Sequence, residues 1–81
     1  MPFKKIFELL GWVGTFFIIL AYFMVSFSFI NPNELIFQFL NLFGALGLIL
    51  TSYQKKNMQP VLLNIFWGAL ALISIIKIIY F

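Results

Sequence analysis

Cysteine and histidine are both absent from this chain of 81 residues, and only two residues, Glu8 and Glu34, are acidic. Without cysteine there is no disulfide, no thiol nucleophile and no thiolate metal ligand. The first long apolar segment separates the two glutamates, so they cannot form a carboxylate pair for acid–base chemistry or metal binding. We therefore expect no enzyme activity, no metal site and no cofactor.

Charge is also scarce, since charged residues make up 9% of the chain and hydrophobic residues 64%. The mean hydropathy is +1.12. A soluble domain of this size buries only about 60% of its surface and covers the rest with polar groups. Five lysines and two glutamates are too few for that. We predict one membrane domain over residues 1–81, with the lipid bilayer as partner and no surface left to bind nucleic acid.

Three long apolar segments fill the chain and predict helices over about residues 6–30, 33–53 and 58–80. Each is close to the roughly 20 residues that a helix needs to cross a bilayer. The first is too long for a signal peptide's apolar region and no A-x-A cleavage pattern follows it, so we interpret it as a retained helix. The predicted fold is an all-α membrane protein, a bundle of three transmembrane helices.

The first connection has the pattern of a helix start. Asn31 is a candidate N-cap, Pro32 suits a first helical position, and Glu34 lies three residues after the cap, as in a capping box. This pattern predicts a tight turn and an antiparallel hairpin of the first two helices.

The lysines predict the orientation, because positive residues stay on the cytoplasmic side. Lys4, Lys5, Lys55 and Lys56 all lie on one side of such a three-span chain, and Lys77 lies near the other. We expect a cytoplasmic N-terminus and an external C-terminus. Lys55 and Lys56 are also expected to stabilise the C-terminal end of the second helix, where the helix dipole is negative.

One stripe of small and polar residues follows each helix, while the other faces carry mainly Phe, Leu and Ile. In lipid, such a stripe marks the side that packs against protein or lines a cavity. Its members that are candidates for contact with a solute are Asn41, Asn64, Gln38, Trp67, Thr15 and Tyr22. Two interpretations remain open: the amides hydrogen-bond the helices together, or they line a solute site. Trp67 is likewise either a packing residue or a platform on which a ring-shaped solute stacks.

An unsatisfied amide in hydrocarbon costs several kcal/mol. Three helices satisfy some of these amides but do not easily enclose a solute. A homodimer with the polar stripes facing each other, around an axis normal to the membrane, would solve both problems.

Two short motifs resemble a family of small three-span bacterial membrane proteins of unknown function. They are Leu40-Asn41-Leu42-Phe43-Gly44-Ala45, an LNLxGA pattern, and Leu63-Asn64-Ile65-Phe66-Trp67, an LNxxW pattern. More distantly, the chain is similar to the SemiSWEET and PQ-loop half-transporters, three-helix bundles that pair in parallel to form a sugar pathway. It differs from them in lacking the Pro-Gln pair of the first helix and in carrying its tryptophan on the third helix.

The resemblance implies a bacterial inner-membrane protein with a SemiSWEET-like architecture. In the half-transporters an asparagine of the third helix is conserved, and Asn64 resembles it, which implies a hydrogen bond to a solute hydroxyl. The expected function is a homodimeric facilitator for a small neutral polar, sugar-like solute. The alternative is an accessory or scaffold subunit that binds another membrane protein or a lipid.

Overall fold

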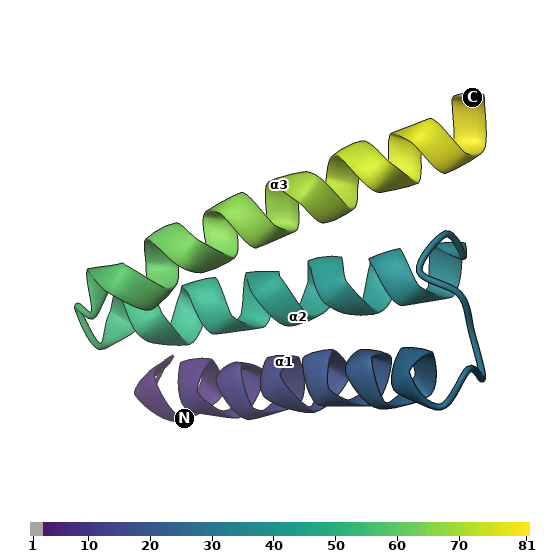
Figure 1. Ribbon diagram of the computed structural model, residues 1–81. Helices are drawn as coiled ribbons and strands as arrows, with labels where there is room; N and C mark the ends of the chain where they lie inside the picture. The colour runs from purple at the N-terminus through teal and green to yellow at the C-terminus, as the bar shows by residue number, and fades with distance from the viewer. Residues whose placement is uncertain (1–2) are drawn as a thin grey trace.

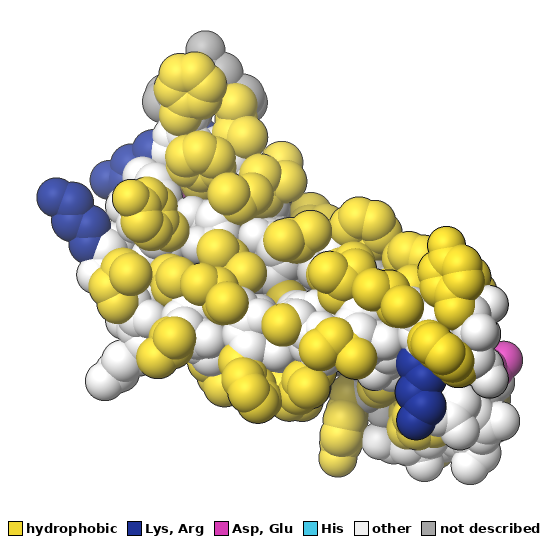
Figure 2. Space-filling model, turned by 90° about the horizontal axis from the view of Figure 1, so that it is seen from above, with side chains coloured by type: hydrophobic (Ala, Val, Ile, Leu, Met, Phe, Trp, Pro, Cys, Tyr) yellow, Lys and Arg dark blue, Asp and Glu magenta, His cyan; other side chains and the backbone are white. Residues whose placement is uncertain are grey.

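The computed structural model describes residues 3–81, which form three helices: α1 (Phe3–Ser26), α2 (Leu35–Gln54) and α3 (Met58–Tyr80) (Figure 1). Each helix is long and apolar enough to span a membrane, which confirms the predicted all-α class with three spans. The backbone extends 40 Å along its longest axis, enough to cross a hydrocarbon core of about 30 Å. In Figure 2 lysine side chains lie near the two ends, and hydrophobic side chains cover much of the face between them. The chain is a multi-pass membrane protein.

Helix α2 lies in the middle and contacts both of the other helices. Among residues 3–81, no Cα atom of α1 lies within 8 Å of one of α3, so the backbones of the three helices form an open layer instead of a closed triangle. Figure 1 shows α3 diverging from α2 toward its C-terminal end, whereas α1 stays close to α2 over its length. The two helix pairs are therefore packed differently.

Glycines bring the backbones of α1 and α2 into direct contact. A Cβ atom added at Gly14 would lie 2.5 Å from the carbonyl oxygen of Gly44, and one added at Gly47 would lie 2.5 Å from that of Leu10. No larger residue fits at either position unless a helix moves. Close backbone approach of this kind maximises van der Waals contact, which drives helix association in lipid.

Side chains separate α2 from α3. The buried residues of α3 recur every three or four positions and face α2: Val61, Asn64, Gly68, Ala71 and Ile75. A Cβ added at Gly68 would lie 3.4 Å from the Cβ of Ala45, which is an ordinary van der Waals distance. This pair of helices is therefore less tightly packed than α1 and α2.

Helix α1 ends at Ser26, before the predicted end at Ile30. The backbone N–H of Phe29 donates to the carbonyl of Met24 at 2.8 Å, and Ser28 has a positive φ of 62°. Together they form a Schellman motif, which closes the last turn of a helix. The ring of Phe29 also lies 6.2 Å from that of Phe23, supplying the apolar contact that accompanies this motif.

Helix α2 begins at Leu35 with Glu34 as its N-cap, so Asn31 is not the cap and the predicted start at residue 33 was too early. The N–H of Glu34 donates to the carbonyl of Asn31 at 3.0 Å, which closes a four-residue turn. Pro32 occupies the second position of that turn, where its fixed φ is favoured, and therefore precedes the helix. The Glu34 carboxylate accepts a hydrogen bond from the Asn31 backbone N–H, which is one half of the predicted capping box.

The connection between α2 and α3 is a second Schellman motif. The N–H of Asn57 donates to the carbonyl of Ser52, and the N–H of Lys56 donates to that of Tyr53, each at 2.9 Å. Lys56 occupies the left-handed position with a φ of 59°. Backbone groups of the lysine pair thus terminate α2, and α3 begins directly afterwards at Met58.

Candidate functional site

One side of the layer is a groove between α1 and α3, with α2 as its floor. Gly44 and Gly47 of α2 approach α1, whereas Ala45 approaches α3. At 100° per residue these two contact faces of α2 lie roughly 130° apart, so the layer is bent and concave on one side. Side chains from α1 and α3 line hollows in common on that side although the backbones of the two helices are apart.

Trp67 is the residue that connects the hollows of this groove. In the middle of the membrane it lines one hollow with Ile18 of α1 and Leu48 of α2; the remaining lining residues there are Leu63 and Asn64. Toward the C-terminal end of α1 it lines a second hollow with Tyr22 and Phe23. Its side chain is 46% exposed, so one part of the indole is available for further contact.

Asn41 and Trp67 form the hydrogen bond that joins α2 to α3. The Nε1–H of Trp67 donates to Oδ1 of Asn41 at 3.3 Å, and Nδ2 of Asn41 donates to the carbonyl of Phe37 at 3.0 Å. Asn41 is 5% exposed, so burial of its amide is compensated within the chain. The same two residues line a third hollow together with Gln38, Phe37, Leu70, Ala71 and Ser74.

Asn64 lies one turn before Trp67 on α3 and is 8% exposed. Its Nδ2 donates to the carbonyl of Pro60 at 2.8 Å. The acceptor is the carbonyl four positions earlier on the same helix, so the side chain bonds back to its own helix. The bond fixes the amide with its nitrogen toward the helix, and the residue lines the hollow beside Leu48 and Trp67.

The other three predicted site residues occupy different places along the groove. The Gln38 Nε2 donates to the carbonyl of Pro32 at 2.9 Å and so ties α2 to the first connection. The Thr15 hydroxyl donates to the carbonyl of Gly11 at 2.9 Å and lines a hollow between α1 and α2. Tyr22 is 74% exposed and lines the hollow near the end of α1. Trp67 therefore shares one hollow with Asn41 and Gln38, a second with Asn64 and a third with Tyr22, whereas Thr15 lines a separate hollow.

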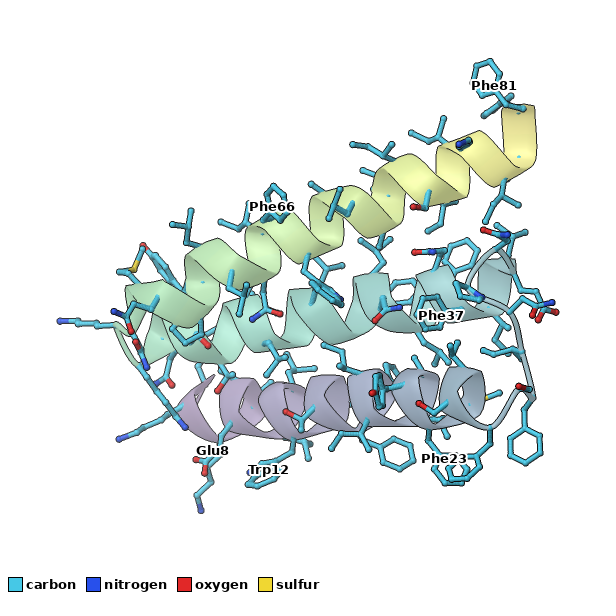
Figure 3. The ribbon with its side chains drawn as sticks, in the orientation of Figure 1. Glu8, Trp12, Phe23, Phe37, Phe66 and Phe81 are labelled. Atoms are coloured by element: carbon cyan, nitrogen blue, oxygen red, sulfur yellow. The ribbon has the colours of Figure 1, made fainter. Side chains whose placement is uncertain are left out.

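Sequence reasoning missed a hollow at the end of the groove where α1 begins and α2 ends. It is lined by residues from both helices: Glu8, Gly11, Trp12 and Thr15 near the start of α1, and Leu48, Thr51 and Lys55 at the end of α2. Figure 3 shows Glu8 and Trp12 projecting from the same side of α1, one turn apart. Their spacing of four residues on one helix face was the signal that could have grouped them.

The groove offers hydrogen bonding and aromatic contact. Its amides and hydroxyls donate or accept hydrogen bonds, and the exposed indoles of Trp12 and Trp67 provide flat apolar surfaces. Among residues 3–81, no group of three or more histidine, cysteine or acidic residues is placed to hold a metal ion.

The model of an uncharacterised protein family matches residues 7–80, and the chain belongs to that family. No curated protein and no solved structure matches the chain. The match covers all three helices apart from the first residues of α1.

Proposed function

We propose that this member of the family works as a homodimer that facilitates movement of a small neutral polar, sugar-like solute across the bacterial inner membrane. The observation that carries the proposal is that all six candidate residues line hollows on the groove side of the layer. In the proposed orientation the N-terminus and the four-lysine end are cytoplasmic.

The open form of the groove supports the dimer. A single chain leaves α1 and α3 apart, so a solute in the groove would lie against lipid on one side. A second copy that presents the same groove would close both and would place each candidate residue beside its two-fold equivalent. Polar groups such as the amides of Asn41 and Asn64 would then border an enclosed path through the membrane.

The absence of cysteine makes this dimer directly testable with single introduced cysteines. Leu63 and Ile65 are both exposed on α3, at 61% and 51%, but side chains two positions apart on a helix point to nearly opposite sides. Leu63→Cys is expected to form a disulfide-linked dimer in native membranes under mild oxidation, and Ile65→Cys is the matched control. Equal cross-linking of both variants, or of neither, would exclude groove-to-groove pairing.

Solute movement needs a separate test in proteoliposomes. Uptake of a panel of labelled neutral solutes, from glycerol to hexoses, identifies any that the wild-type protein admits. Asn64→Ala should then reduce the flux of that solute, whereas Asn33→Ala, in the exposed first connection, should not. Unchanged flux in Asn64→Ala and Asn41→Ala would remove these residues from the pathway.

The second candidate function is that of an accessory subunit that docks on another membrane protein. It is favoured because the polar groups of the groove already have hydrogen-bond partners within the chain. Asn41, Trp67, Thr15 and Gln38 already donate hydrogen bonds within the chain. The hollows around Trp67 are otherwise bordered mostly by apolar side chains, which suit a dry contact with a partner helix. Affinity capture from native membranes decides this point: a stoichiometric partner lost in Trp67→Ala but retained in Phe66→Ala supports docking.

A further inference from the structure

The hollow at the lysine-rich end of the groove carries both signs of charge within a mostly apolar molecule. Glu8 is the acidic residue of the three helices, and it lies in the second turn of α1. Lys55 follows the last residue of α2. Both side chains are exposed and line the same hollow of about 240 Å³. An ionisable residue within a membrane span is expensive, and its presence points to a specific partner.

The remaining lining residues add two further kinds of contact. Trp12 is 69% exposed and lies one turn after Glu8, and Figure 3 shows both side chains on the side of α1 away from α2. An indole face attracts a cation through its quadrupole. The hydroxyl of Thr51 lies in the same hollow and can donate to an anionic oxygen, whereas that of Thr15 donates to the Gly11 carbonyl and can only accept a further bond.

We propose that this hollow binds a zwitterion in which two carbon atoms link a primary ammonium to the ester oxygen of an anionic phosphate. Glu8 and the face of Trp12 would receive the ammonium. Lys55 would receive the phosphate, because an ammonium side chain at the membrane surface extends toward charged headgroups. This assignment does not depend on solute transport or on dimerisation.

Two sources supply this chemistry: the headgroup of phosphatidylethanolamine, and a free zwitterion such as glycerophosphoethanolamine. The position of the hollow suits a lipid, since its charged residues lie at the end of the span and Leu48 lies further in. The charges of a small soluble zwitterion have the same spacing, so the experiment has to separate the two sources.

In the first arm, wild-type protein is placed in nanodiscs that contain equal amounts of phosphatidylethanolamine and phosphatidylglycerol, and retained lipid is counted by native mass spectrometry. In the second arm, nanodiscs of phosphatidylglycerol alone are titrated with glycerophosphoethanolamine while tryptophan emission is recorded. Enrichment of the ethanolamine lipid identifies the headgroup as ligand, and a saturable emission change identifies the free zwitterion. Equal retention of both lipids together with no emission change would overturn the proposal.

Charge-neutral variants link either signal to the hollow. Glu8→Gln and Lys55→Met should each weaken the responding signal by about threefold, a loss typical of an exposed ionic contact. Glu34→Gln and Lys77→Met are the matched controls at the opposite end of the molecule and should leave it unchanged. Both Glu8 and Lys55 are exposed, so the variants are expected to fold, and circular dichroism checks this. If Glu8→Gln behaves like the wild type, the ammonium is not bound at this hollow and the assignment fails.

Discussion

The contact between α1 and α2 and the contact between α2 and α3 solve the same problem in different ways. In the first, glycines remove the side chains and let the backbones meet, with Gly14 packed on Gly44 and Gly47. In the second, side chains stay in place and one hydrogen bond, from Trp67 to Asn41, crosses between the helices. Lipid tails are as apolar as leucine, so association in a membrane depends on close packing or on interhelical hydrogen bonds. This small chain uses close backbone packing between α2 and α1, and an interhelical hydrogen bond between α2 and α3.

The difference has a functional consequence. The α1–α2 pair is tightly packed, and a residue larger than glycine cannot enter it without moving backbone. The α2–α3 pair is looser and diverges toward the C-terminal end of α3 in Figure 1. Trp67, which borders three hollows, belongs to the looser pair. We therefore expect any movement that opens or closes the groove to displace α3 against a rigid α1–α2 hairpin.

The largest predicted effect is the difference in stability between two Gly→Ala variants. Gly14→Ala places a Cβ 2.5 Å from the Gly44 carbonyl oxygen and should lower the free energy of unfolding by about 2 kcal/mol through overpacking. Gly68→Ala meets only an ordinary contact and should leave stability unchanged or raise it by up to about 1 kcal/mol. Unfolding in mixed micelles of increasing dodecyl sulfate fraction, followed by circular dichroism, measures both. Similar losses for the two variants would contradict the proposed difference in packing.

The second effect concerns the connection between α2 and α3. Lys56 has a φ of 59°, a conformation that costs a residue with a side chain about 1 kcal/mol. Lys56→Gly should therefore stabilise the protein by about 0.5–1 kcal/mol in the same unfolding experiment. Lys55→Gly removes the same charge at a residue with a φ of −84° and should give no gain. A gain of equal size in both variants would assign the effect to charge.

The smallest effect is that of the interhelical hydrogen bond. Trp67→Phe removes the Nε1–H donor while keeping an aromatic ring, and should cost about 0.6 kcal/mol, the average for such bonds in membrane proteins. A double-mutant cycle with Asn41→Leu isolates the bond from the packing change. Additive effects of the two substitutions would mean that the bond contributes nothing and that packing alone joins α2 to α3.

Much of the fold follows from the sequence because the bilayer restricts it so strongly. Segments of this length and hydropathy have to be helices, since backbone polar groups in hydrocarbon must be satisfied within the segment. Helix ends were harder to predict. The two Schellman motifs place Ser28 and Lys56 in a left-handed conformation that glycine usually adopts. The end of α1 therefore carried no signal in the sequence, whereas the end of α2 at Gln54 was predicted to within one residue. Pro32 pointed to a helix start but serves the turn before it.

Part of the candidate site was predictable because polar residues are rare in the three apolar segments. The sequence analysis assigned one polar stripe to each helix and thereby identified the amides and the tryptophan that the groove contains. Helix α2, however, has two contact faces, and Gly47 and Thr51 belong to the face toward α1, whereas the predicted residues Gln38 and Asn41 do not. A central helix needs two such faces, and which helix is central depends on packing between segments that are distant in the chain.

The sequence by itself determined the environment of this protein, its three spans and the absence of cysteine and histidine chemistry, because composition and segment length alone control transfer into lipid. Only the tertiary structure decided that α2 is the middle helix, that α1 and α3 leave a groove between them, and that Glu8 and Lys55 border one hollow. These features depend on which helix surfaces can approach most closely. At Gly14 one added methyl group would collide with the backbone of α2, whereas at Gly68 it would make an ordinary contact with α2.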